Sequence, residues 1–147
     1  MELVSQSTMR IGLALSGGGV RAAIFHLGVL SRLASDNLLE HVTFLSTVSG
    51  GSLVTGLVYS IAGNRWPSSS DFLYMVLPQA RHAITQTNMQ RGIVRRCLLP
   101  PWRLPFARAK IVAESIRHTW GITGTLQDIP EDPRWVINAT SYESGKN

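Results

Sequence analysis

The fold is decided by the stretch Val42-Thr43-Phe44-Leu45-Ser46-Thr47-Val48-Ser49-Gly50-Gly51-Ser52-Leu53. Its apolar and β-branched first half predicts a buried strand, which ends at a Ser-Gly-Gly turn and restarts as a helix. A strand that turns sharply into a helix at a serine is the layout of a nucleophile elbow, which exposes the hydroxyl at the sheet edge. Ser49 is therefore the candidate nucleophile, and Gly50 and Gly51 supply the small neighbours that a tight turn needs.

The elbow pattern is incomplete at one position. The usual form is G-x-S-x-G, whereas this chain reads Thr47-Val48-Ser49-Gly50-Gly51, with threonine in place of the first glycine. A second interpretation is that Ser49 only caps the following helix, which is a common role of serine. This stretch alone leaves both interpretations open.

A glycine loop lies earlier in the chain, where a predicted strand over 9–15 runs into Ser16-Gly17-Gly18-Gly19-Val20-Arg21 and then into a predicted helix over 20–34. Consecutive glycines at such a point let backbone N–H groups converge on one negative oxygen. Gly17, Gly18 and Gly19 are thus candidates for an oxyanion hole. Arg21, in the first helical turn, is a supporting candidate that would hold an anion or an acidic group, with a solvated surface role as its alternative.

Two alternatives concern the same loop. Its amides at a helix start would also hold a phosphate, so a nucleotide-binding α/β module is the second function to consider. The dinucleotide fingerprint is weakly matched, because no acidic residue occurs in the 42–52 stretch where the second strand ends. Ser16 is a second candidate nucleophile, although the glycines after it suit a donor loop better.

The order strand–helix–strand–helix predicts an α/β fold with a parallel-type sheet and flanking helices. Asp71 is expected to cap a helix that begins at Phe72, and Pro78 to kink or interrupt it. Residues 106–120 are predicted to be helical and residues 135–140 to form a third strand. We expect residues 1–147 to be a single, partial catalytic domain.

Composition narrows the class of protein. The 147 residues are 44% hydrophobic, with a formal net charge of +5 and a single cysteine, which excludes an intrachain disulfide. The span 81–110 interleaves arginines with apolar residues and predicts peripheral contact with an anionic membrane, whereas no nucleic-acid-binding motif accompanies it. The charge-free segment 42–64 is too rich in serine, threonine and glycine for a membrane span. We expect a cytoplasmic or peripheral membrane protein without metal or cofactor.

At these residues the chain resembles the patatin-like phospholipases. The loop 17–21 matches that family's G-G-G-x-R motif after the first strand, and 47–51 its G-x-S-x-G elbow after the second. Residues 136–145 look like the family's strand that ends in Ala-Thr, followed by a Gly-closed turn. The resemblance implies a serine hydrolase of lipid or phospholipid esters, with Ser49 as nucleophile and Gly17–Gly19 as oxyanion loop.

The resemblance also implies a Ser–Asp dyad, whose aspartate lies in an Asp-Gly-Gly/Ala motif beyond the Ala-Thr strand. This sequence contains no Asp-Gly dipeptide, and its aspartates occur in cap, loop or proline contexts. We therefore expect the dyad aspartate beyond Asn147 and little activity from this polypeptide alone. A Ser–His arrangement stays formally open, but a surface position or core packing is expected for all four histidines: His26, His41, His82 and His118.

Overall fold

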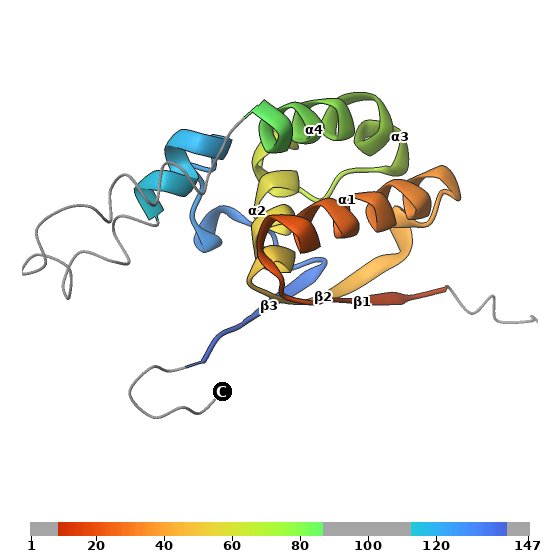
Figure 1. The fold of residues 1–147 in the computed structure, drawn as a ribbon. Coiled ribbons are helices and arrows are strands. Elements are labelled where there is room, and N and C mark those ends of the chain that lie inside the picture. The colour runs from red at the N-terminus through yellow and green to blue at the C-terminus, as the bar shows by residue number, and fades with distance from the viewer. Residues whose placement is uncertain (1–8, 87–112, 141–147) are drawn as a thin grey trace, which may run out of the picture.

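In a computed structural model, which describes residues 9–86 and 113–140, the chain forms a parallel sheet covered by helices on one face (Figure 1). The strands are β1 (Ile11–Leu15), β2 (Val42–Val48) and β3 (Arg134–Asn138). They are ordered β1-β2-β3, and both pairings are parallel. The predicted α/β class with a parallel sheet and flanking helices is confirmed.

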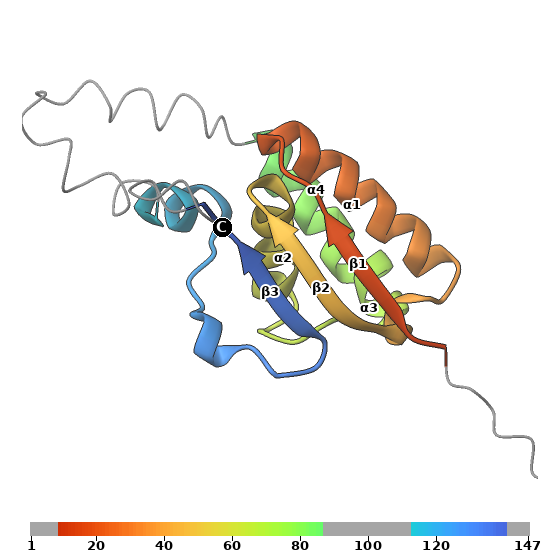
Figure 2. The same ribbon diagram turned by 90° about the horizontal axis from the view of Figure 1, so that it is seen from below.

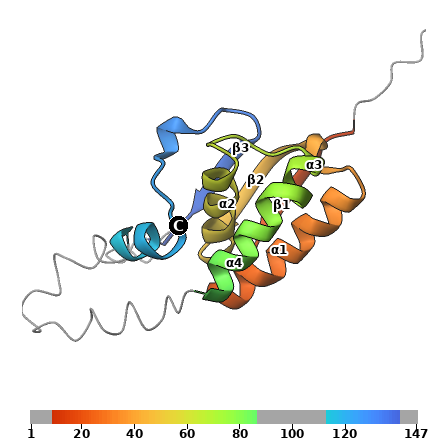
Figure 3. The ribbon, with the colours of Figure 1, turned by 90° about the horizontal axis from the view of Figure 1, so that it is seen from above.

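The helices follow the strands in turn. Their bounds are α1 (Gly19–Ser35), η1 (Leu39–His41), α2 (Gly50–Ile61), α3 (Ser69–Asp71), the π-helical η2 (Phe72–Val76), α4 (Leu77–Gln86) and η4 (Leu126–Asp128). Residues 113–120 are also helical. Views from below and from above show α1, α2, α3 and α4 on the same face of the sheet (Figures 2 and 3).

The core lies between the sheet and this helical layer. Along β2, Leu45 and Thr47 point to the helices and are buried, whereas Phe44 and Val48 alternate with them and are exposed. This period of two is the pattern of a strand with one covered face. On α1, Ala23, Leu27, Leu30 and Ala34 are buried, as their helical spacing predicts.

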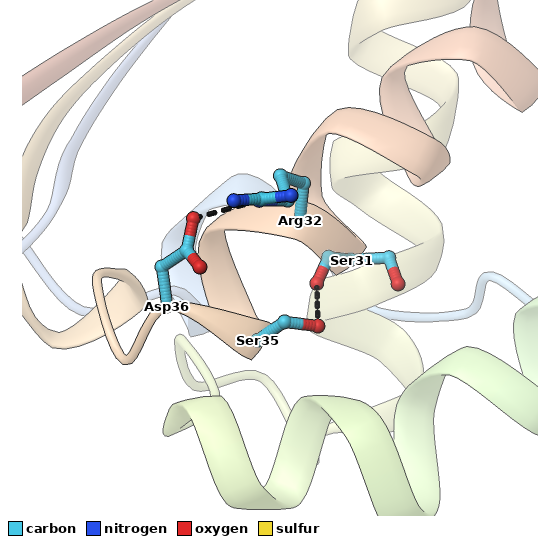
Figure 4. A network of polar contacts seen from close by, with 4 residues as sticks. All are labelled: Ser31, Arg32, Ser35 and Asp36. Carbon is cyan, nitrogen blue, oxygen red and sulfur yellow. Dashed lines mark hydrogen bonds and ion pairs between the residues drawn. The ribbon is translucent and has the colours of Figure 1, made fainter.

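The last turn of α1 carries a small polar network on the protein surface (Figure 4). The Arg32 Nε donates to Asp36 Oδ2 at 2.8 Å, and the Ser35 hydroxyl donates to the Ser31 carbonyl at 2.9 Å. Asn37 then adopts a left-handed conformation with φ 54°, which ends the helix. The Arg32–Asp36 ion pair is exposed, so solvent screens it. The left-handed backbone at Asn37 therefore contributes more than the ion pair to ending the helix.

The predicted start of the third helix is wrong. The helical run begins at Ser69, and Ser68 is its N-cap, because the Ser68 hydroxyl oxygen accepts a hydrogen bond from the Asp71 N–H at 3.0 Å. Asp71 is the third helical residue, and its carboxylate lies 3.8 Å from the Arg65 guanidinium. Serine at 68 competes successfully for the cap because its short side chain reaches the free N–H groups of the first turn.

Pro78 does not interrupt the helical run. The run passes from η2 into α4 at Leu77, whose N–H donates to the carbonyl of Phe72, five residues earlier. Proline removes an N–H donor and crowds the preceding turn, and a π-helical turn provides a wider path for the backbone. The predicted interruption is therefore replaced by a local change of helix type.

The remaining boundaries agree within two residues where the structure describes them. The predicted strand over 9–15 is β1, and the one over 135–140 is β3. The predicted helix over 106–120 is found at 113–120, while its first part and most of the basic span 81–110 lie outside the described residues. Among the described helices, none has the length and apolar character needed to cross a membrane.

A carboxylate links the end of the first βαβ connection to the third helix. The Ser69 N–H and the Ser69 hydroxyl each donate to one oxygen of the Glu40 carboxylate, both at 2.6 Å. Partial burial raises the pKa of Glu40, but these two hydrogen bonds lower it more, so the net pKa lies below its ordinary value. The ionised form of Glu40 is therefore favoured by folding.

We expect Glu40→Gln to lower the free energy of unfolding near neutral pH by about 1 kcal/mol, since solvent screens part of the interaction. Because the folded pKa is depressed, the stabilisation is present above the unfolded value of about 4.3 and is lost as pH falls through the folded pKa. Urea unfolding at about pH 7 and about pH 3 measures this difference. Glu131→Gln is the control, because Glu131 is exposed and makes no hydrogen bond within the described residues. An identical pH dependence in wild type and Glu40→Gln would contradict the assignment.

Candidate active site

The glycine loop and the elbow meet at one edge of the sheet. Leu15, the last residue of β1, pairs with Thr47, so the carboxyl ends of β1 and β2 are aligned. The chain leaves β1 directly into the glycine loop and leaves β2 through Ser49 into α2. A Cβ built on Gly17 would lie 3.3 Å from the Ser49 Cβ, so the two predicted motifs are direct neighbours with little room between them.

Ser49 has a strained backbone and an unpaired hydroxyl. Its φ and ψ are 50° and −114°, a region that residues with a side chain rarely adopt. The Ser49 hydroxyl makes no capping hydrogen bond to α2 and no other hydrogen bond within the described residues, and the residue is exposed. Helix capping therefore does not explain Ser49. Strain of this kind costs about 1–3 kcal/mol and clusters at functional sites.

Gly50 and Gly51 bring α2 against the backbone of the loop. A Cβ on Gly50 would overlap the carbonyl oxygen of Gly19, and a Cβ on Gly51 would overlap the carbonyl oxygen of Leu15. Both glycines are buried. No side chain fits at either position, because the obstructing atoms belong to the backbone and cannot rotate away.

The glycine loop itself is exposed and adopts conformations that favour glycine. Gly18 has φ 141° and Gly19 has φ 63°, and Gly18 is the N-cap of α1. Gly17, Gly18 and Gly19 are all solvent-exposed. The first N–H groups of a helix have no carbonyl partner within the helix, so they are free to bind a negative oxygen. The loop thus offers amide donors beside Ser49.

Arg21 projects from the first turn of α1 and is exposed. Within the part of the chain that the structure describes, Arg21 forms neither an ion pair nor a hydrogen bond. The acidic partner that the sequence allowed is thus not found among these residues, and Arg21 adds a positive charge near the start of α1.

Thr47, which replaces the first glycine of the elbow pattern, has a structural task. Its side chain is buried, and its Oγ1 accepts a hydrogen bond from the Trp135 Nε1 at 2.8 Å. The same oxygen lies 2.8 Å from the Ser52 Oγ. One hydroxyl therefore ties β2 to β3 and to the first turn of α2, which a glycine would not do.

Asn138, at the carboxyl end of β3, also supports the elbow. Its Nδ2 donates to the Ser46 Oγ at 3.0 Å and to the Thr47 carbonyl at 3.2 Å. These contacts cross from β3 to β2 immediately before Ser49. The sequence pointed to this strand through its Ala-Thr ending, but nothing in the sequence singled out Asn138.

His26 is the residue whose contacts the sequence did not predict. It is buried in α1, and its Nε2 lies 3.0 Å from the Ser16 carbonyl oxygen and 3.4 Å from the Ser16 Oγ. A carbonyl oxygen only accepts hydrogen bonds, so Nε2 carries the hydrogen. Nε2 therefore has no lone pair with which to take a proton from Ser16, and this contact does not make Ser16 an activated nucleophile. The sequence offered one indication that His26 is buried: it stands next to Leu27 and three residues after Ala23, on the face of α1 that packs against the core.

Three of the described aspartates have partners away from Ser49. Asp36 pairs with Arg32, Asp71 with Arg65, and Asp128 accepts two hydrogen bonds from Thr125 in a capping box. Those two bonds lower the pKa of Asp128. No carboxylate or histidine in the described ranges hydrogen-bonds to Ser49, and no group of three metal-ligating side chains gathers there.

A strained serine at a strand-to-helix turn beside a loop of backbone donors is an arrangement typical of serine acyl hydrolases. The chain matches the family model described as patatin-like phospholipase over residues 13–134. Because that match covers most of its length, the chain belongs to the patatin-like phospholipase family.

Individual relatives are distant and cover less of the chain. Cytosolic phospholipase A2 gamma of Mus musculus is 49% identical over 49 residues, which is 33% of this chain and 8% of that protein. Lysophospholipase 3 of Saccharomyces cerevisiae is 36% identical over 81 residues, which is 47% of this chain and 11% of that protein. The chain thus spans a small part of these relatives. No solved structure matches it significantly.

The packing of α2 on the loop predicts the effect of one methyl group. Gly50→Ala should reduce the free energy of unfolding by about 1–3 kcal/mol, because the methyl group would overlap the Gly19 carbonyl and force α1 and α2 apart. Gly28→Ala is the matched control, because a Cβ on Gly28 in the middle of α1 meets no atom within 4 Å. That control should be neutral or stabilising by up to about 1 kcal/mol. Equal urea midpoints for the two variants would contradict the close approach.

Proposed function

We propose that this domain hydrolyses lipid esters, with Ser49 as nucleophile. The Ser49 Oγ attacks the ester carbonyl carbon, the alcohol leaves, and water then hydrolyses the acyl-enzyme. The observation that carries the proposal is the position of the strained, unpaired Ser49 in contact with Gly17. Membership of a phospholipase family supports lipid esters as the substrate class.

The amides of Gly17, Gly18 and Gly19 would stabilise the oxygen anion that forms during this attack. Backbone donors suit this role because they are fixed before the reaction and need no rearrangement as charge develops. Arg21 and the N-terminus of α1 add positive potential near the same loop. The phosphate-binding alternative uses these groups as well, but it gives no reason for the strain at Ser49.

Activation of Ser49 requires a base, since an unassisted serine hydroxyl is a weak nucleophile. Asp36, Asp71 and Asp128 each have another partner. Asp132 precedes the amino end of β3, whereas Ser49 follows the carboxyl end of the parallel strand β2, so the two residues lie at opposite ends of the sheet. We therefore propose that the base is a carboxylate outside the described residues. Activity should accordingly be measured on the full-length protein that carries this domain.

We expect Ser49→Ala to reduce lipid ester hydrolysis by about 10⁴-fold or more, since the reacting atom is lost. Ser16→Ala should retain most activity, because the substitution leaves unchanged the Ser16 backbone carbonyl, which accepts the hydrogen bond from His26. Turnover of a phospholipid in mixed micelles, with melting temperatures checked for each variant, measures both effects.

Near-normal turnover by Ser49→Ala, in protein free of host esterase, would overturn the nucleophile assignment. If a nucleotide also raised the melting temperature of that variant, the phosphate-binding function would take its place. Ser60→Ala serves as a further control, because Ser60 lies on the same helix, α2, but its hydroxyl donates to the Gly121 carbonyl, away from Ser49.

A further inference from the structure

His26 is a buried polar residue whose role in the site has yet to be assigned. Its side chain is 4% exposed, and its Nε2–H donates to the Ser16 carbonyl at 3.0 Å, ten residues earlier in the chain. Its ring also packs edge-on against Phe25, with centroids 5.5 Å apart. Its other ring nitrogen, Nδ1, is buried without a hydrogen-bond partner among the described residues, so the cost of burying this imidazole is only partly offset and core filling alone does not explain it.

The Ser16 carbonyl belongs to the same peptide unit as the Gly17 N–H. A peptide unit is planar and normally trans, so its C=O and N–H point in opposite directions. In the described residues, the Asp132–Pro133 bond is the one cis peptide. A donor that fixes the Ser16 oxygen toward α1 therefore also fixes the direction of the Gly17 N–H, away from α1.

The Gly17 peptide needs such a fixing contact. It precedes two further glycines, and glycine gives the backbone more freedom than any other residue. Gly17 is also solvent-exposed, so neighbouring residues confine it only on the side of Val48 and Ser49. His26 is well placed to supply the constraint, because it is held on the buried face of α1, a regular helix of 17 residues.

We propose that His26 is a positioning residue, which orients the 16–17 peptide so that the Gly17 N–H serves as an oxyanion donor beside Ser49. A hydrogen bond to the carbonyl also polarises the N–H of the same peptide, which strengthens it as a donor. His26 itself neither touches the substrate nor transfers a proton. The inference rests on the proposed hydrolase function and adds to it a residue that acts through the loop.

The test compares three replacements of His26 in the full-length protein. Glutamine places an amide N–H at the same number of bonds from Cα as the imidazole Nε2, so His26→Gln should retain kcat within about threefold. Asparagine is one bond too short, and leucine fills the buried volume without a donor. His26→Asn and His26→Leu should each lower kcat by about 100-fold, as expected for a group misplaced by about 1 Å, with little change in KM.

NMR relaxation gives a second readout that does not depend on activity. The backbone N–H order parameters of residues 17–19 should be lower in His26→Leu and His26→Asn than in wild type, and unchanged in His26→Gln. A purely structural role for His26 would instead lower the melting temperature and leave kcat unchanged in the folded fraction.

The outcomes separate this inference from the function on which it rests. Unchanged kcat in His26→Leu, with Ser49→Ala inactive, would overturn the positioning role and leave the nucleophile in place. Failure of His26→Gln to retain either wild-type kcat or wild-type loop order would also overturn it. If Ser49→Ala stayed active, the proposed function would fail, while the order parameters of residues 17–19 would still decide whether His26 holds the loop.

Discussion

The close approach of α2 to two backbone carbonyls is the constraint on which the rest of the site depends. Gly50 lies against the Gly19 carbonyl, and Gly51 lies against the Leu15 carbonyl. Interiors are packed too densely for either contact to accept a methyl group without movement of a helix. This approach places the turn at Ser49 next to the glycine loop, and the strained backbone of Ser49 follows from it.

Around that contact, side chains on four elements hold the edge of the sheet in place. The Thr47 hydroxyl connects β2 to Trp135 on β3 and to Ser52 on α2, and His26 on α1 holds the loop that leaves β1. Each bond joins two different parts of the fold, and the one between Thr47 and Trp135 spans 88 residues of sequence. A site built from rigid elements in this way can keep its donors oriented before substrate arrives, which is the condition for electrostatic stabilisation of a transition state.

The sequence was sufficient to predict the strand–turn–helix units, because their signals are local. Val42–Val48 is an apolar, β-branched run that ends at a Ser-Gly-Gly turn, and α1 shows helical spacing of its buried residues. Ser49 and the glycines were found through the same local patterns. The helix start at Ser69 was not predicted, because it depends on which of the neighbouring polar residues caps the helix. The uninterrupted helical path through Pro78 was not predicted either, because it depends on a change of helix type. The roles of Thr47, Asn138 and His26 could not be predicted, because each bonds to a partner brought near only by the tertiary fold.

The central claim is that Ser49 is the reactive serine, and mapping of a covalent adduct tests it most directly. Full-length protein is treated with a fluorophosphonate and digested, and the modified residue is identified by mass spectrometry. The account predicts an adduct on Ser49 that is formed by folded protein and abolished by prior denaturation. An adduct on Ser16 or Ser52 instead would contradict it. Loss of hydrolysis on treatment with the reagent, with Ser49 left unmodified, would contradict it as well.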